Sequence, residues 1–221
     1  MDRQEFLTNI RRQLETARLP EAAVERPRPL ALPEPTSRAA MVEQFVQEVE
    51  LVSGHVHRVD SAEAALNRLE ALFEQYNARG YLGWDAEHLP FAGVHDFLAQ
   101  RGYERGKTRI DDRSADQNAL AHYKIGITGA MAGIADTGSV MLQMGAGRGR
   151  LASLLPLVHV VLMTTGQIVP TLNHFIRDNA RANFDSSNVV AVTGPSRTGD
   201  IGGVLTLGVH GPKEVHIILN G

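Results

Sequence analysis

The fold of this chain is decided by residues 188–219, which read NVVAVTGPSRTGDIGGVLTLGVHGPKEVHIIL. An apolar run opens the stretch at 188–192 and a second closes it at 214–219, and both are typical of buried strands in a parallel sheet. Two glycine-rich segments, 193–201 and 208–212, lie between these runs. Ligands of open α/β sheets bind on loops outside the carboxyl ends of the strands, so we expect the two segments to form the functional rim.

Helical and strand-like patterns alternate along the rest of the chain. Apolar residues recur every three or four positions over 38–52 and 62–77, which predicts helices, whereas 55–59 alternates as a strand does. Short apolar runs at 125–129 and 158–163 predict further strands. We therefore expect an α/β fold with a mostly parallel sheet and helices on both of its faces.

Three segments divide the chain. Residues 1–18 carry apolar side chains at spacings of three and four, which predicts an amphipathic N-terminal helix. Residues 19–37 are rich in proline, which removes backbone donors, so they are predicted to form an extended linker. Residues 38–221 are predicted to form the α/β domain. The N-terminal helix either folds back on its own domain or reaches a partner.

Composition limits the classes of function. The chain has 221 residues, a net charge of −3 and no cysteine, which excludes disulfides, thiol catalysis and iron–sulfur ligation by this chain. It has no long run of charges of one sign, which argues against nucleic-acid binding. Its N-terminus lacks the apolar core of a signal peptide, and its most apolar run, 154–163, is about half of a bilayer span. We expect a cytoplasmic protein without membrane insertion.

The segment 193–201 carries the strongest candidates for ligand binding. Gly194 allows a tight backbone path, Ser196 and Thr198 supply hydroxyls, and Arg197 supplies a cation. Backbone N–H groups at the start of a following helix would bind a carboxylate or a phosphate. The alternative is a structural turn in which Ser196 or Thr198 caps that helix.

Three further residues, Asp136, Asp200 and His210, are candidates for catalysis. His210 lies in a loop, where it could act as an acid or base near neutral pH or simply tie down the backbone. Asp136 could be a general base at the floor of a pocket, although Asp and Gly are also what tight turns such as 136–139 favour. A triad of Ser196, Asp200 and His210 would suit a hydrolase, but the G-x-S-x-G pattern is missing.

The histidines elsewhere in the chain predict no metal site. His55 and His57 would share one face of a strand, but no third ligand lies near them in the sequence. His159, His174 and His216 are scattered among apolar residues, so we expect them in the core or at its flank.

Four motifs stand out along the chain: ITGA at 127–130, IADTGS at 134–139, TGPSRTGDI at 193–201 and GVHGP at 208–212. Together they resemble the lactate utilisation protein C family, the cysteine-free branch of the LUD-domain proteins. The resemblance implies a fold like that of ribose-5-phosphate isomerase, glucosamine-6-phosphate deaminase and the CoA transferases. We expect the motifs to line one cleft, with ligand-binding groups at Thr128, Gly129, Thr137, Gly138, Gly194, Ser196, Arg197, Thr198 and Gly211.

The resemblance also implies a function. It indicates a component of a system that oxidises L-lactate to pyruvate, with a small carboxylate or phosphate-bearing ligand on this chain. Iron–sulfur clusters would belong to partner subunits, and no cofactor is expected here. The alternatives are a free-standing isomerase, ligase or acyl-CoA transferase, or a non-catalytic assembly subunit. Asp136 stands where many relatives have the longer Glu, which makes a nucleophile of the CoA-transferase kind doubtful.

Overall fold

The structure of the protein is a computed structural model, which describes residues 2–16, 37–106, 120, 122–181, 186–201 and 204–221, the side chains of 200, 201, 204 and 205 excepted. The predicted linker at 19–37 lies outside these residues, except for its last one. The helices are α1 (Arg3–Thr16), α2 (Arg38–Leu51), α3 (Ala62–Gln75), α4 (Val94–Gln100), α6 (Leu151–Leu154), α7 (Leu172–Asp178) and the 3-10 turns η1 (Ala86–His88) and η2 (Thr165–Gln167). The strands are β1 (His55–Val59), β2 (Gly80–Gly83), β3 (Glu104–Gly106), β4 (Ile125–Thr128), β5 (Ala132–Ile134), β6 (Ser139–Met144), β7 (Val158–Thr164), β8 (Ile168–Val169), β9 (Asn188–Val192), β10 (Arg197–Ile201), β11 (Val204–Leu207) and β12 (Glu214–Asn220).

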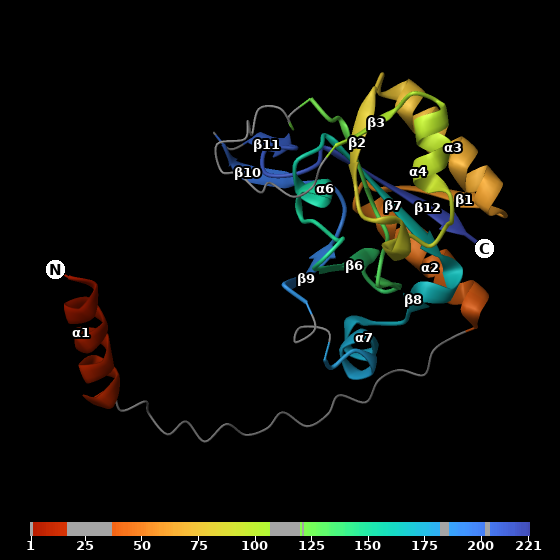
Figure 1. Cartoon of the computed structure of the whole chain (residues 1–221). Coiled ribbons are helices and arrows are strands. Elements are labelled where there is room, and N and C mark those ends of the chain that lie inside the picture. Colours follow the sequence, from red (N-terminus) through yellow and green to blue (C-terminus); the bar gives the residue numbers. More distant parts are fainter. Residues whose placement is uncertain (1, 17–36, 107–119, 121, 182–185, 202–203) are drawn as a thin grey trace. The chain divides into compact units, whose positions relative to one another are not determined.

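The centre of the fold is a parallel sheet of six strands in the order β1-β12-β7-β4-β2-β3 (Figure 1). Its middle strands, β7 and β12, are buried along almost their whole length. Such strands are rich in Val, Ile and Leu because both of their faces are covered. The α/β class with a mostly parallel sheet, predicted from the sequence, is confirmed.

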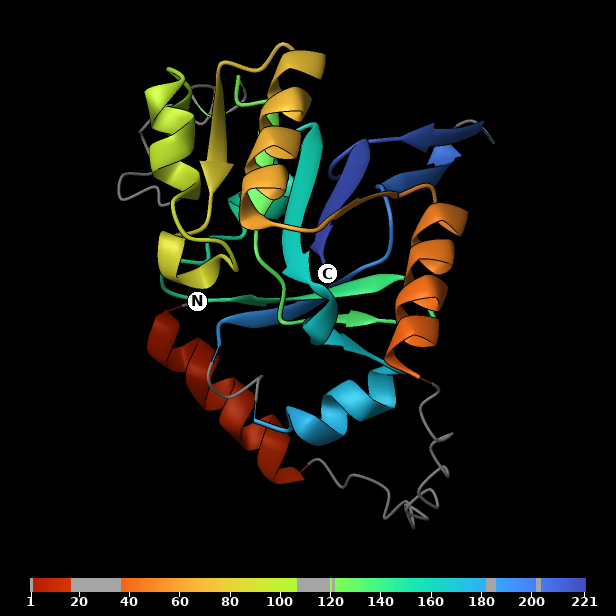
Figure 2. The ribbon, with the colours of Figure 1, turned by 90° about the vertical axis from the view of Figure 1, so that its right-hand side faces the viewer.

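Helices cover both faces of this sheet. α3 packs on β1 and β12 and contacts α4, while α6 packs on β4 and α2 on β1. Figure 2 shows α3 and α4 on one side of the strands and α2 on the other. α3 begins where the Ser61 hydroxyl accepts a hydrogen bond from the Ala64 N–H, and its inward stripe includes Leu69, Leu72 and Phe73.

A second, mixed sheet has the strand order β8-β5-β6-β9. β5 and β6 form an antiparallel hairpin whose reversal is the predicted turn at 136–139. Gly138 has a φ of 62° in this turn, and a Cβ there would lie 2.4 Å from the backbone nitrogen of Val49 in α2. Only glycine combines that conformation with so close an approach to a helix.

Two predictions about the deciding stretch are wrong. Residues 188–192 are not a buried parallel strand: they form β9, which pairs antiparallel with β6 at the edge of the second sheet and is partly exposed. An apolar run of five residues suits such an edge as well as a buried position. Residues 197–201 do not open a helix either, because they form β10 and pair antiparallel with β11. The helix start that was expected to bind an anion is therefore not formed.

The position of the glycine-rich segments also differs from the prediction. The N–H groups of Lys213 and Glu214 both donate to the Leu157 carbonyl, so the start of β12 lies beside the start of β7. The segment 208–212 leads directly into β12 and therefore lies at the amino ends of the parallel strands. The carboxyl ends, marked by Thr128 of β4 and Thr164 of β7, lie at the opposite edge of the sheet.

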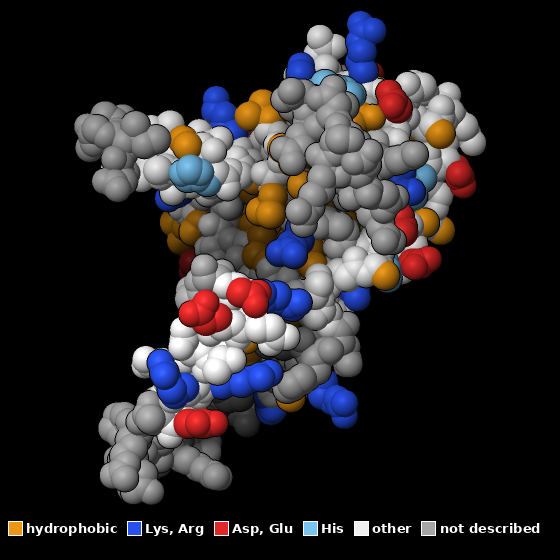
Figure 3. All heavy atoms as spheres, turned by 60° about the vertical axis from the view of Figure 1, so that its left-hand side comes forward, with side chains coloured by type: hydrophobic (Ala, Val, Ile, Leu, Met, Phe, Trp, Pro, Cys, Tyr) orange, Lys and Arg blue, Asp and Glu red, His pale blue; other side chains and the backbone are white. Residues whose placement is uncertain are grey.

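α1 falls within the segment that the sequence predicts as an amphipathic helix. It belongs to a unit separate from the α/β domain, and within that unit its Phe6, Ile10 and Leu14 are exposed. None of the described helices combines the length and the apolar composition that a bilayer crossing requires. On the face shown in Figure 3, described basic and acidic side chains lie interspersed, in keeping with the net charge of −3.

Candidate functional site

The two glycine-rich segments meet through Ser196. Its N–H donates to the Pro212 carbonyl at 2.9 Å, and its own carbonyl accepts from the Gly208 N–H at 2.9 Å. Its hydroxyl accepts from the backbone N–H of His210 at 3.3 Å. The Ser196 hydroxyl thus has a backbone partner rather than an imidazole base, which is not the arrangement of an activated serine nucleophile.

Arg197 and Gly194 pack against the end of α2. The Arg197 guanidinium donates to the Val52 carbonyl and to the Ser53 hydroxyl, both at 2.8 Å. A cation at the carboxyl end of a helix interacts favourably with its dipole. Gly194 has a φ of 73°, and a Cβ there would lie 2.4 Å from the Val52 carbonyl oxygen. Both residues hold the segment 193–201 in place, and their role toward a ligand stays a prediction.

The turn at 136–139 reaches the same region through hydroxyl groups. The Thr137 hydroxyl lies 2.8 Å from that of Ser139, which lies 2.7 Å from that of Thr193. Asp136 and Thr137 are exposed. The turn and the segment 193–201 therefore meet, as the sequence predicts.

Thr128 and Gly129 lie elsewhere. Thr128 is fully buried at the carboxyl end of β4, where its hydroxyl lies 2.9 Å from Nε2 of His159. A Cβ at Gly129 would lie 2.2 Å from the His88 carbonyl oxygen. The four motifs therefore do not line one shared cleft, because the first of them lies at the opposite edge of the sheet.

Three predicted site residues remain. The side chain of Asp200 lies outside the described part of the chain. Thr198 is paired with Thr206 across β10 and β11. Gly211 lies against Ser196, and a Cβ there would approach the Ser196 Cβ to 3.3 Å.

A cleft of about 550 Å³ opens at the amino ends of β1 and β12. The segment 193–201 supplies Pro195 to its wall, Leu207 and Lys213 flank the segment 208–212, and β1 and β12 supply His55, His57 and Glu214. Its lining comprises Glu50, Ser53, Gly54, His55, Val56, His57, Pro195, Leu207, Lys213 and Glu214. This cleft, rather than a rim at the carboxyl ends, is the candidate functional site.

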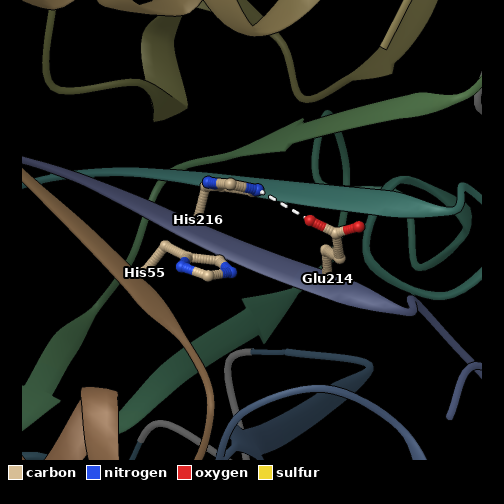
Figure 4. A group of neighbouring side chains, drawn as sticks. All are labelled: His55, Glu214 and His216. Carbon is tan, nitrogen blue, oxygen red and sulfur yellow. Dashed lines mark ion pairs between the residues drawn. The ribbon is translucent and has the colours of Figure 1, made fainter. Parts of the chain in front are cut away.

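Three titratable side chains of the cleft wall, His55, His57 and Glu214, lie beside His216 and Tyr76, and we call these five residues the histidine cluster. β1 and β12 are parallel neighbours in which His55 is in register with His216. Residues two apart on a strand project to the same face, so two histidines of β1 lie beside two polar residues of β12. The His55 and His57 rings stack on that of His216 at centroid distances of 4.7 Å and 5.2 Å. Figure 4 shows three members of the cluster.

Hydrogen bonds order the cluster from His57 to Glu214. Tyr76 donates its only hydroxyl proton to the Glu214 carboxylate, and its oxygen lies 2.8 Å from Nε2 of His216. Nδ1 of His216 lies 2.9 Å from Nε2 of His57. Because Tyr76 has no second proton, a neutral His216 donates from Nε2 to Tyr76 and can accept at Nδ1 from Nε2 of His57, a nitrogen that also lies 3.5 Å from Nη2 of Arg68.

Two imidazoles of the cluster, those of His57 and His216, have lowered pKa values and are neutral at physiological pH. Burial, the Arg68 cation and the neighbouring histidines lower the pKa of His57 to about 4. Burial and the nearby His55 lower the pKa of His216 to about 4. Burial and the hydrogen bond to Glu214 raise the pKa of the Tyr76 hydroxyl. A neutral imidazole can accept a proton or ligate a metal ion, so the cluster could act as a general base or as a metal ligand.

Comparison with known proteins places this chain in a family. Residues 42–220 match the LUD domain. The chain belongs to the LUD domain family. Lactate utilization protein C of Halalkalibacterium halodurans is 28% identical over 95% of this chain and 94% of its own length. Lactate utilization protein B of Bacillus subtilis is 37% identical over 43% of this chain and 19% of its own length.

A solved structure shares the fold of this LUD domain. The crystal structure of a DUF162 family protein from Deinococcus radiodurans has a TM-score of 0.62 and 25% identity, and the likeness covers 85% of this chain and 100% of that one. The resemblance that the four motifs indicated is thereby confirmed at the level of the family.

The histidine cluster of this LUD domain is what sequence reasoning missed. No third ligand was expected near His55 and His57, but the parallel pairing of β1 with β12 brings Glu214 and His216 beside them. His216 is buried, as predicted, yet it has polar partners on both ring nitrogens. The signal available in the sequence was a shared pattern: β1 and β12 each begin with polar side chains two residues apart.

Proposed function

We propose that this LUD-domain chain is a component of an L-lactate utilisation system and binds a small carboxylate in the cleft at the amino ends of β1 and β12. The observation that carries the proposal is the likeness to lactate utilization protein C along 95% of this chain and 94% of that protein. A likeness over such a length concerns the whole architecture and not one shared motif.

The cleft has the chemistry that a small hydroxy acid requires. Lys213 is exposed in its wall, and within the described residues no ion pair or hydrogen bond engages its ammonium group. A carboxylate would pair with this cation, and the imidazoles of His55 and His57 offer partners for a hydroxyl. Pro195 and Leu207 supply an apolar wall for a methyl group. L-Lactate carries these three groups.

The oxidation itself divides between this chain and its partners. Conversion of L-lactate to pyruvate releases two protons and two electrons. A neutral imidazole of the cluster accepts the hydroxyl proton, and the hydrogen of the broken Cα–H bond leaves as the second proton to water. The electrons pass to iron–sulfur-type partner subunits, because this chain has no cysteine to ligate a cluster.

Deletion of the gene in its source organism tests the role. With the partner genes intact, we expect growth on L-lactate to stop and growth on pyruvate to continue. A wild-type copy and a Lys213→Arg copy should restore growth, whereas Lys213→Glu should not, because it places a second negative charge beside the substrate. Undiminished growth of the deletion strain on L-lactate would falsify the proposal.

Binding to the purified chain distinguishes this role from the enzyme alternatives. A ligand at one hundred times its Kd stabilises the folded state by about 2.7 kcal/mol, which raises the melting temperature measurably. We expect L-lactate or pyruvate to produce this shift. A shift with CoA or a sugar phosphate, and none with the two acids, would favour an isomerase, ligase or acyl-CoA transferase.

A docking role for α1 is a second candidate, favoured by its exposed apolar stripe. Phe6 is 49% exposed and Leu14 is 68% exposed. The apolar stripe of an amphipathic helix is normally covered by another protein surface, so this stripe is suited to bind a partner subunit. Removal of residues 1–37 should therefore abolish co-purification with the partner subunits. Co-purification that survives this truncation excludes the docking role.

A further inference from the structure

We propose that His55, Glu214 and His216 bind one divalent transition-metal ion at the amino ends of β1 and β12, with an open coordination position facing the cleft. Two imidazoles and a carboxylate are a donor set that zinc and non-haem iron sites of enzymes use. Imidazole ligation disfavours Mg²⁺ and Ca²⁺, which prefer oxygen donors. The proposal stands on this geometry and does not depend on the lactate role.

The ligand atoms lie close to the spacing that an ion imposes. Nε2 of His216 lies 3.6 Å from Oε2 of Glu214. Two ligands of a tetrahedral zinc ion stand roughly 3.4 Å apart, so this pair already matches. One ligand atom of each residue lies within 4.8 Å of the others. His55 is exposed, and rotation of its side chain can close the remaining distance.

Figure 4 shows how the three side chains approach one another. The His55 and His216 rings lie beside one another on neighbouring strands, and the dashed line joins His216 to Glu214. His216 is 3% exposed and therefore held in place, whereas His55 and Glu214 line the cleft. The ion would thus enter from the cleft and rest on a buried ligand.

The remaining members of the cluster supply the outer partners that metal ligands need. When the ion takes Nε2 of His216 in place of the hydrogen bond to Tyr76, the ring proton moves to Nδ1, which then donates to Nε2 of His57 across the 2.9 Å distance. Tyr76 keeps its hydrogen bond to the Glu214 carboxylate. Ligating histidines and carboxylates in proteins commonly have such hydrogen-bonded partners.

Sequence reasoning had predicted no metal site because it lacked the third ligand that β12 supplies.

Zn²⁺ titration of the full-length chain tests the site. After treatment with a chelator, we expect isothermal titration calorimetry to show one Zn²⁺ per chain. Co²⁺ should give the visible absorption bands of a four- or five-coordinate ion rather than the weak bands of the hydrated one. A wild-type chain that binds no Zn²⁺, or whose Co²⁺ spectrum is that of the hydrated ion, overturns the proposal.

Two variants assign the ligands, and a third serves as the control. His55→Ala changes an exposed residue and Glu214→Gln preserves shape, so both should remain folded, which circular dichroism verifies. Each should raise the Kd for Zn²⁺ more than about 100-fold, since even outer partners are worth about 10–100-fold. His122→Ala removes an exposed histidine outside the cluster and should leave the Kd unchanged. An equal Kd in all three variants overturns the assignment.

Tyr76→Phe tests whether the outer partners belong to the metal site or the three ligands lie together by chance. This variant removes only the hydroxyl that orients Glu214, and it leaves all three ligands present. A built site should lose about 10–100-fold in affinity for Zn²⁺. Unchanged affinity in Tyr76→Phe would show that the outer partners have no part in binding.

Discussion

Two buried histidines on neighbouring strands, His159 of β7 and His216 of β12, have opposite surroundings. His159 is in register with Val215, so the two histidines project to opposite faces of the sheet. His159 is sealed at 0% exposure, with Thr128 as its partner and with Nδ1 lacking one among the described residues. His216 has partners on both nitrogens and lies beside an open cleft. Burial alone therefore does not distinguish the two histidines: the nearby cleft and the further titratable groups around His216 do.

Lowering the pH should have the largest effect on this comparison, because it protonates both histidines and reduces the free energy of unfolding. Burial lowers the pKa of His159 from 6.5 to about 4, and those of His57 and His216 are also lowered to about 4. The unfolded chain therefore binds more protons between these values, so the stability present above pH 6.5 is lost as the pH falls toward 4. We expect about 3 kcal/mol from His159 and less from the other two, which solvent screens.

Urea unfolding at neutral pH and at about pH 4.5 measures this loss. In His159→Leu the difference between the two conditions should shrink, because the largest contributor is gone. A free energy of unfolding that stays constant over this range would contradict the assigned neutral states.

The sealed face of the sheet should tolerate no added atom at Gly126. A Cβ there would lie 1.8 Å from the Ala152 carbonyl oxygen, where α6 crosses β4. Gly126→Ala should cost about 3 kcal/mol of unfolding free energy, because backbone rather than a flexible side chain must move. Gly166→Ala is the matched control, since its Cβ would meet only the Thr164 hydroxyl, at 3.7 Å. Similar melting temperatures for the two variants would contradict the close packing of α6.

Two substitutions, each of which removes the hydroxyl partner of one histidine, compare the surroundings of His159 and His216 directly. Thr128→Val leaves the sealed Nε2 of His159 without a partner and should cost roughly 1–3 kcal/mol. Tyr76→Phe should cost less, about 1 kcal/mol, because water from the cleft can replace the lost hydroxyl. Chemical denaturation of both variants measures the difference. The reverse order would mean that the cleft is closed to water.

Arg197 gives the smallest effect and separates a structural role from a ligand role. Its guanidinium is exposed and bonds the end of α2, so Arg197→Ala should cost only about 0.5 kcal/mol. If the ligand lies in the cleft as proposed, its affinity should fall further in Lys213→Ala than in Arg197→Ala. The opposite ranking in a ligand titration would indicate that the ligand binds at the segment 193–201, as predicted from the sequence.

Much of the sheet was predictable from sequence because its strands are continuous apolar runs. Residues 55–59, 158–163 and 214–219 were placed within one or two positions of β1, β7 and β12. β9 was misjudged as buried, since a short apolar run does not reveal how many neighbours a strand has. The segment 208–212 was expected at the carboxyl ends, although any segment that leads into a strand lies at its amino end.

The histidine cluster was beyond prediction for a different reason. Its two halves, at His55 and His57 and at Glu214 and His216, belong to strands at opposite ends of the sequence. Nothing local indicates that β1 pairs with β12 rather than with the next strand in sequence. The family motifs pointed to segments that brace the end of α2, among them Gly138, Gly194 and Arg197. The titratable groups lie on the strands beside them.

The place of β12 between β1 and β7 has a consequence for biosynthesis. β1 ends at Val59, but the strand that completes its ladder begins only at Glu214. On the ribosome, the nascent chain therefore exposes two unpaired strand edges until most of the domain has been translated, and such edges attract other chains. A chaperone that shields β1 and β7 during this interval would favour the yield of folded protein.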